Sequence, residues 1–218
     1  MSKKKPFFIV FEGIEGCGKS FQSKKLYQNL IKKKFKPILT REPGGTNNAE
    51  LIRKLILSDY FGKKERKKFD RYTDTLLYLA ARNEHVKNKI YPELKKKKIV
   101  ICDRFTDSTM AYQVFGKKVK KNFINFIHKF ILGKIKPNIV FILKVNLDIS
   151  RKKINKRKNK NRYDKFPKEF YRKAQNAFIN IAKNKRRYVI LDSSKENNEL
   201  EKKIFNIVIK RMKRWNQI

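Results

Sequence analysis

The chain has 218 residues, 40% of them hydrophobic, which is enough apolar material for one folded domain with a full-sized core. Its 58 lysine and arginine residues outnumber 19 acidic residues, and the formal net charge is +39. No run approaches the roughly 18 apolar residues of a membrane span, and we do not expect the apolar run near the N-terminus to be a signal peptide. Cys17 and Cys102 have no metal-ligand spacing, so we expect reduced thiols in the cytoplasm.

The positive charge has two interpretations. A basic surface is typical of proteins that bind nucleic acids. However, the basic residues are scattered along the chain, and lysine, asparagine and isoleucine are all abundant, which indicates a composition bias. We favour the bias, because net charge governs solubility and non-specific binding and not fold. We therefore expect no specific nucleic-acid partner and no membrane partner, and a basic nucleic-acid-binding ATPase is kept as the alternative class of function.

Predicted strands and helices alternate along the chain. Short apolar runs predict strands at residues 7–11, 37–40, 99–102, 138–145 and 188–191. Apolar residues at helical spacing predict helices at residues 20–34, 48–57, 70–96, 123–132, 147–155, 167–186 and 198–214, the third with a break near Pro92. This alternation is typical of an α/β fold with a parallel five-stranded sheet and helices on both faces. Ligands of such sheets bind at the carboxyl ends of the strands.

The first strand leads into FEGIEGCGKS, which contains the phosphate-loop pattern G-x-x-x-x-G-K-S. Glycines let backbone N–H groups approach phosphate oxygens, and the following helix begins with partial positive charge. The pattern predicts a nucleoside triphosphate ligand, with Lys19 at its β- and γ-phosphates and the Ser20 hydroxyl on Mg²⁺. The residues predicted to form this loop are Gly13, Ile14, Glu15, Gly16, Cys17, Gly18, Lys19 and Ser20.

The third predicted strand ends in the pair Asp103-Arg104. An acidic residue at the end of an apolar strand is the usual partner of a phosphate loop, where it holds Mg²⁺ directly or through water. Arg104 is suited to bind a phosphate through two of its N–H groups. A salt bridge at the end of the strand is the alternative interpretation of this pair.

Polar residues in three other stretches are expected near the same edge of the sheet. TREPGGT follows the second strand, and its Glu-Pro pair at Glu42 predicts a cis peptide bond or a tight turn. Tyr78 and Arg82 share one helix face, where a ring and a guanidinium suit a planar base. A core tyrosine beside a surface arginine is the alternative. DRFTDSTMAYQ adds short polar side chains suited to read a base or a sugar, among them Thr109 and Gln113.

Together these motifs resemble the thymidylate kinase family. The match runs in order over nearly the whole chain and includes an arginine-containing basic lid at residues 151–165. REPGG combined with DR-x-x-x-S-x-x-AYQ is specific to this family among nucleoside monophosphate kinases. The resemblance is greatest to the bacterial form, in which the phosphate loop carries an acidic residue, here Glu15, and the lid supplies the catalytic arginine.

The resemblance implies a P-loop NTPase fold in one nucleoside monophosphate kinase domain spanning residues 1–218. It implies the reaction ATP + dTMP ⇌ ADP + dTDP with Mg²⁺, a step of dTTP synthesis for DNA replication. It also implies a homodimer, formed through the apolar helices around Leu76 and residues 123–132. Another nucleoside monophosphate kinase, acting on dUMP or dCMP, is the alternative within the same class.

The resemblance further implies a role for each matching residue. The catalytic group would be Lys19, Arg104 and a lid arginine, Arg157 or Arg162. Mg²⁺ would lie on Ser20 and on Asp103, directly or through water. The residues that would hold dTMP are Glu42, Arg53, Tyr78, Arg82, Arg104, Thr109 and Gln113.

Two departures from the family pattern concern the base pocket and the lid. Tyr78 stands where the family more often has phenylalanine against thymine, and the lid is so rich in lysine that its alignment is weak.

The acceptor phosphate is already a nucleophile, so no catalytic base is needed. His85 and His128 are accordingly predicted to be helix-surface or packing residues.

Overall fold

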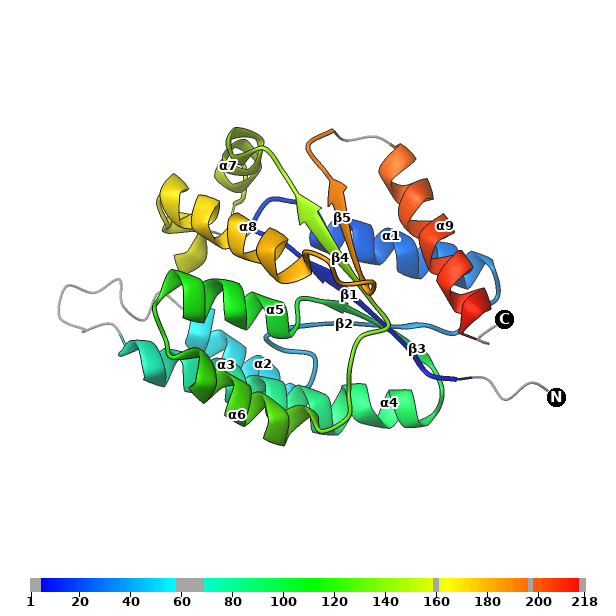
Figure 1. Cartoon of the computed structure of the whole chain (residues 1–218), viewed down its shortest axis with the longest axis horizontal. Helices are drawn as coiled ribbons and strands as arrows, with labels where there is room; N and C mark the ends of the chain where they lie inside the picture. Colours follow the sequence, from blue (N-terminus) through cyan, green and yellow to red (C-terminus); the bar gives the residue numbers. More distant parts are fainter. Residues whose placement is uncertain (1–4, 58–68, 159–160, 196–197, 216–218) are drawn as a thin grey trace.

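One parallel sheet of five strands runs through the computed structural model, which describes residues 5–57, 69–158, 161–195 and 198–215. The strands are β1 (Phe7–Glu12), β2 (Ile38–Arg41), β3 (Ile99–Asp103), β4 (Ile139–Lys144) and β5 (Tyr188–Asp192), in the order β2-β3-β1-β4-β5 (Figure 1). All the strand pairs are parallel, as the alternating sequence pattern predicted. The predicted α/β fold is therefore confirmed.

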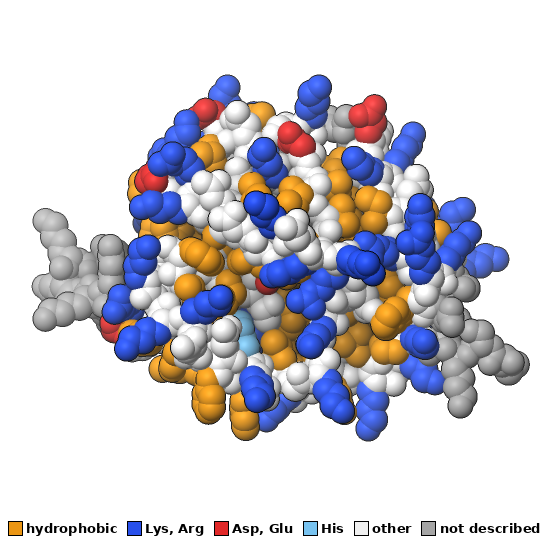
Figure 2. All heavy atoms as spheres, in the orientation of Figure 1, with side chains coloured by type: hydrophobic (Ala, Val, Ile, Leu, Met, Phe, Trp, Pro, Cys, Tyr) orange, Lys and Arg blue, Asp and Glu red, His pale blue; other side chains and the backbone are white. Residues whose placement is uncertain are grey.

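Helices cover both faces of the sheet (Figure 1). The α-helices are α1 (Lys19–Lys32), α2 (Asn47–Leu57), α3 (Arg71–His85), α4 (Tyr91–Lys95), α5 (Thr106–Thr109), α6 (Lys121–Leu132), α7 (Leu147–Asn155), α8 (Lys168–Ala182) and α9 (Asn198–Arg214). Two π-helical segments, η1 (Val86–Ile90) and η2 (Met110–Gly116), continue α3 and α5, and a 3-10 turn, η3 (Arg162–Lys165), precedes α8. None of the described helices is both long and apolar enough to cross a membrane. Lysine and arginine side chains are spread over the face of the molecule that Figure 2 shows and do not gather in one patch.

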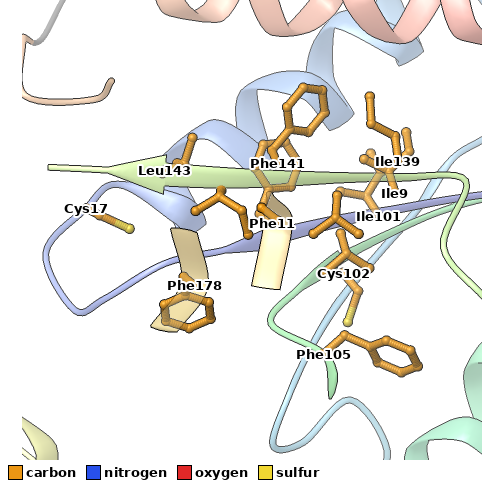
Figure 3. Close-up of a cluster of buried hydrophobic side chains, with 14 of the residues drawn as sticks. Ile9, Phe11, Cys17, Ile101, Cys102, Phe105, Ile139, Phe141, Leu143 and Phe178 are labelled. Atoms are coloured by element: carbon orange, nitrogen blue, oxygen red, sulfur yellow. The ribbon is translucent and has the colours of Figure 1, made fainter. Parts of the chain in front are cut away.

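The core lies along the central strands because both faces of the sheet are covered, which favours continuous apolar runs. Every residue of β1 is buried. Phe11 is paired in register with Phe141 on β4, and their rings stack with centroids 5.2 Å apart (Figure 3). Phe105, which follows β3, meets Phe8 edge to face at 5.1 Å. Each buried ring of this kind contributes about 1.5–3 kcal/mol relative to exposure.

Three local features differ from the sequence prediction or add to it, the first being the form of the break predicted near Pro92. The long helix over residues 70–96 widens into the π-helical turn η1 just before Pro92, because proline has no N–H and its ring crowds the preceding turn. Residues 106–116 form α5 and η2, a stretch for which the sequence predicted polar side chains near the site but no helix. Helix α8 ends at Ala182 and not at residue 186, since Asn184 takes a left-handed conformation with φ of 59°.

The strand order brings three motifs together at the carboxyl edge. In the register of the sheet, Asp103 is paired with Phe11 of β1 on one side and Arg41 of β2 on the other. The phosphate loop, the Asp103-Arg104 pair and the turn at Glu42 therefore begin at neighbouring positions. In the lid predicted at residues 151–165, Asn159 and Lys160 lie outside the described residues.

Candidate active site

The phosphate loop is packed against β4 and α7. A Cβ at Gly13 would lie 2.6 Å from the carbonyl oxygen of Leu143, and one at Gly16 would lie 2.6 Å from that of Ser150. Ser150 also donates its hydroxyl to the Glu15 carbonyl at 2.7 Å. Gly18 has no such neighbour within 4 Å, but its φ of +89° disfavours any side chain. The glycines therefore serve both close packing and backbone conformation.

Lys19 folds back over this loop. Its Nζ donates to the Ile14 carbonyl at 2.7 Å, and the side chain is buried. The ammonium group thus lies inside the ring of backbone that is typical of phosphate cradles. The role of Lys19 at the terminal phosphates of a nucleotide stays a prediction.

Ser20 and Asp103 form the donor set for the predicted cation. The Ser20 hydroxyl donates to Oδ2 of Asp103, although the two residues are 83 positions apart. Oδ1 of Asp103 is buried and has no hydrogen-bond partner in the described part of the chain. The described residues contain no group of three or more His, Cys, Asp or Glu side chains that could hold a metal. This donor set fits Mg²⁺, which usually takes one or two protein ligands and completes its octahedron with phosphate oxygens and water.

Arg104 links the turn after β3 to the phosphate loop. Its guanidinium donates to the Gly13 carbonyl and to the Ser108 hydroxyl, each at 2.9 Å, and to Glu15 Oε1 at 2.8 Å. Burial tends to raise the pKa of Glu15, but the positive charge of Arg104 holds that pKa below its ordinary value. Arg104 therefore pairs with Glu15 across the site and not with its neighbour Asp103.

Arg82 is the centre of a buried polar network on the acceptor side. It donates to Glu42 Oε2, to the Thr109 hydroxyl and to His128 Nε2 at 2.7 Å each, and to the Phe105 carbonyl at 2.9 Å. Arg82 and Thr109, both predicted to read thymine, are thus bonded to each other. These bonds use four of the five N–H groups of Arg82, and the fifth is on Nη2, which lies 2.7 Å from Glu42 Oε2. Direct donation from Arg82 to a base carbonyl would therefore compete with Glu42 for that group.

The sequence interpretation of the two histidines was incomplete. His85 is fully buried and contacts the Thr40 hydroxyl at 2.6 Å and Glu42 at 3.1 Å, so it is part of the polar network. His128 is also buried, and burial together with the charge of Arg82 lowers its pKa to about 3. His128 is therefore neutral and accepts a hydrogen bond from Arg82. Local sequence could not reveal this, because each partner comes from another element.

Arg53 and Glu42 lie on either side of the turn after β2. The Glu42–Pro43 peptide is cis, one of the two predicted alternatives. Arg53 on α2 donates to the Pro43 carbonyl at 2.7 Å and faces the same pocket as Arg104. Two guanidinium groups thus line the same pocket, where an anionic phosphate would be stabilised.

The lid brings its two arginines to different places. Arg157 donates to Asp164 Oδ1 at 2.6 Å and borders both the central pocket and a second cavity beside the phosphate loop. Arg162 pairs with Asp74 of α3 and borders neither cavity. Tyr163, which follows Arg162, lies edge to face against Tyr78 with centroids 6.2 Å apart.

Most of the predicted residues surround the central pocket. Those that line it are Glu15, Lys19, Ser20, Glu42, Arg53, Tyr78, Arg82, Asp103, Arg104, Thr109, Gln113 and Arg157. Gly16, Cys17 and Gly18 line the second cavity, together with Lys19, Ser20 and Arg157. Gly13, Ile14 and Arg162 line neither.

Residues of the site that sequence reasoning did not assign to it include Glu12, Asp74, His128 and Tyr163. Glu12 was visible in FEG, and Tyr163 in the lid string NRYD, but neither string says what the side chain touches. Asp74 is buried and receives both Arg162 and Lys117, which ties the lid to α3. Such contacts depend on the packing of distant elements.

Comparison with known proteins now bears on this geometry. The family model "Thymidylate kinase" matches residues 11–204. The chain belongs to the thymidylate kinase family. The thymidylate kinase of Wolbachia sp. subsp. Brugia malayi (strain TRS) is 41% identical over 207 residues, which cover 92% of this chain and 95% of the relative. That of Aster yellows witches'-broom phytoplasma (strain AYWB) is 38% identical over 97% of this chain and 99% of its own.

A solved structure supports the same assignment. The crystal structure of thymidylate kinase from Ehrlichia chaffeensis superimposes with a TM-score of 0.73 at 31% identity, and the match covers 94% of this chain and 99% of that one. The resemblance drawn from the motifs is therefore confirmed, as are the P-loop NTPase fold and the class of enzyme, a phosphotransferase of the thymidylate kinase family.

Proposed function

We propose that this chain transfers the γ-phosphoryl group of ATP to dTMP, which yields ADP and dTDP, within one catalytic domain over residues 1–218. Family membership supports the reaction. The observation that carries the proposal is one pocket in which the phosphate-loop lysine, Asp103 and Arg104 lie together with Tyr78 of the base-facing helix. Donor and acceptor sites are thus contiguous, as direct phosphoryl transfer requires.

On the donor side, backbone N–H groups of the phosphate loop and Lys19 would hold the ATP phosphates. Ser20 and Asp103 would hold Mg²⁺, which supplies charge neutralisation on the phosphates when bound. Because Lys19 already lies over the loop, a phosphate needs only to replace the Ile14 carbonyl as its partner.

On the acceptor side, Arg53 and Arg104 would bind the dTMP phosphate. Tyr78 would lie against thymine, with Arg82, Thr109 and Gln113 at its polar edge. Glu42 would keep Arg82 in place, since it accepts a hydrogen bond from the Arg82 guanidinium inside the protein. The acceptor oxygen attacks directly, so the residues act by positioning and by stabilising charge in the transition state.

Of the two lid arginines, we propose that Arg157 is the one that contacts the transferred phosphoryl group. Arg157 borders both the acceptor pocket and the cavity beside the phosphate loop, so it lies between the two substrates. Arg162 is paired with buried Asp74 and anchors the lid to α3. Closure of such a lid would also exclude water and limit hydrolysis of ATP.

A coupled ADP-release assay with ATP and Mg²⁺ tests this function. The acceptors are dTMP, dUMP, dCMP, AMP and GMP, each compared with a reaction lacking an acceptor. Strong turnover with dTMP, weaker turnover with dUMP and none with the others is expected. Equal rates for all five, or turnover without an acceptor, would contradict the proposed base pocket.

We also propose that the enzyme works in the cytoplasm as a homodimer. Helices α2, α3 and α6 pack side by side and leave large apolar side chains exposed, including Leu51, Leu76, Phe126 and Phe130. Phe126 is 77% exposed and Phe130 80%, which is costly unless a partner covers them. Sedimentation of the wild type should give a dimer, and Phe126→Asp should give a monomer. A wild-type monomer at micromolar concentration would refute this part.

A further inference from the structure

Glu12, the last residue of β1, is fully buried beneath the turn that carries Arg104. Its Oε1 accepts the backbone N–H groups of Phe105 at 2.8 Å and Ser108 at 3.1 Å. Its Oε2 accepts the Ser108 hydroxyl at 2.6 Å. A buried carboxylate is costly unless it is hydrogen-bonded, and here every bond goes to one short segment. Glu12 is therefore bonded to the start of α5 and to the turn that precedes it.

The backbone of that turn needs to be held. Arg104 has a φ of 73°, in the left-handed region that residues other than glycine rarely adopt. Such a conformation persists only where the surroundings enforce it. The peptide before Arg104 donates to the Phe11 carbonyl at 2.9 Å, and the peptide after it donates to Glu12. The last two residues of β1 thus fix both sides of Arg104.

The side chain of Arg104 is held by the same assembly. Ser108 Oγ, which donates to Glu12, accepts a hydrogen bond from the Arg104 guanidinium at 2.9 Å. The same guanidinium reaches Gly13 and Glu15, one and three positions beyond Glu12 in the chain. Hydrogen bonds therefore hold both the backbone and the side chain of Arg104 against the end of β1, where the phosphate loop begins.

We infer that Glu12 is a positioning residue that sets the acceptor-binding Arg104 in register with the donor phosphate loop. This inference rests on the proposed function of Arg104. It predicts that the fit of the acceptor's phosphate, and not that of ATP, depends on Glu12. A displacement of about 1 Å at a positioning group costs on the order of 10²-fold in rate.

The test compares Glu12→Ala with Glu12→Gln. The alanine leaves two backbone N–H groups without acceptors, whereas the glutamine oxygen retains both of them. Burial and the neighbouring charge of Asp107 raise the pKa of Glu12, which favours its protonated, neutral form. Glutamine, which is also neutral, resembles that form. Gln175→Ala is the matched control, because Gln175 holds both backbone polar groups of Val145, after β4, at 3.0 Å each.

We expect Glu12→Ala to lower kcat/KM for dTMP by roughly 10²-fold, mainly through KM for dTMP, with KM for ATP within threefold. Glu12→Gln should stay within tenfold of the wild type, and Gln175→Ala should change thermal stability without changing KM for dTMP. A folded Glu12→Ala with kcat/KM within threefold of the wild type, or with equal losses for ATP and dTMP, overturns the inference.

A second pair of variants decides the case if Glu12→Ala does not fold. Ser108→Ala removes only the hydroxyl shared by Glu12 and Arg104. A threefold or larger rise in KM for dTMP alone in Ser108→Ala supports the inference, and an unchanged KM for dTMP in a folded Ser108→Ala overturns it, whatever Glu12→Gln shows. Wild-type turnover tests the proposed function separately. Should the wild type prefer another monophosphate, the same variants are measured with that acceptor, because the argument concerns its phosphate.

Discussion

The donor and acceptor halves of this site are built in different ways. The donor half comes from one continuous loop and the start of the helix that follows it, residues 13–20, with Asp103, Arg104 and Ser150 as distant partners. The acceptor half draws on α2, α3, the turn after β3, α5 and the lid. The sequence motif of the donor half therefore predicts both its position and its chemistry. For the acceptor half, the sequence predicts only which residue types are present, because their partners depend on how distant elements pack.

The lid gives the largest expected effect, because one of its two arginines, Arg157, lies where the two halves meet. Arg157 borders both cavities, and Arg162 is paired with Asp74. Arg157→Ala should lower kcat by roughly 10³–10⁵, as expected for an arginine on the transferred group. Arg162→Ala should lower it by less than about tenfold, because the lid anchor is weakened but buried Asp74 keeps Lys117 as a partner. Steady-state kinetics at saturating substrates measures both, and a larger loss in Arg162→Ala would reverse the assignment.

The phosphate loop provides the next effect and shows how local the donor half is. Gly16 and Gly18 both have positive φ, but only a Cβ at Gly16 would strike a backbone atom, the Ser150 carbonyl of α7. Alanine at either position should cost about 1–2 kcal/mol for the left-handed backbone. Gly16→Ala should cost about 1–3 kcal/mol more, for the overpacked contact.

Denaturant unfolding of the two variants against the wild type measures this difference. A larger loss for Gly16→Ala shows that even the donor loop depends on a distant element that its motif does not reveal. Equal losses would mean that α7 yields to the extra atom and that the loop is set by its own backbone alone.

A pH effect tests the buried network of the acceptor half. His128 contacts Arg82, with Glu42 on the far side of that guanidinium, and its pKa is lowered to about 3. In the unfolded chain it titrates near 6.5, so below that pH the unfolded state binds a proton that the folded state does not. The contribution is complete above pH 6.5 and is lost progressively as the pH falls toward 3.

The expected loss from His128 is about 2 kcal/mol between pH 7 and pH 5. His128→Gln keeps an acceptor for Arg82 but cannot titrate, so its stability should fall less over that interval. Chemical denaturation at several pH values measures the two slopes. Parallel slopes would show that the pKa of His128 in the folded protein is not lowered relative to that in the unfolded chain.

The sequence predicted the parallel five-stranded sheet, the alternation of strands and helices along the chain, and the family. Apolar runs and helical spacing report burial directly, so strands such as β3 were found within one residue. The boundary of α8 was missed because Asn184 gives a weaker stop signal than glycine or proline. In the site, the motifs pointed to Tyr78, Arg82 and Thr109, and all three line the central pocket. The bonds that Arg82 makes to Thr109 and His128 join α3, α5 and α6, and no local pattern records them.

The smallest effect concerns Tyr78, where this chain departs from the more usual phenylalanine. Burial raises the pKa of the Tyr78 hydroxyl to about 12, so the ring stays neutral at physiological pH and can stack as phenylalanine would. Tyr78→Phe should therefore keep KM for dTMP within about threefold, whereas Tyr78→Ala should raise it by roughly 10- to 100-fold, the value of one stacked base. Binding of dTMP measured by calorimetry separates the two. A large loss in Tyr78→Phe would instead assign the affinity to the hydroxyl and its contact with Tyr163, and base recognition would then pass through the lid.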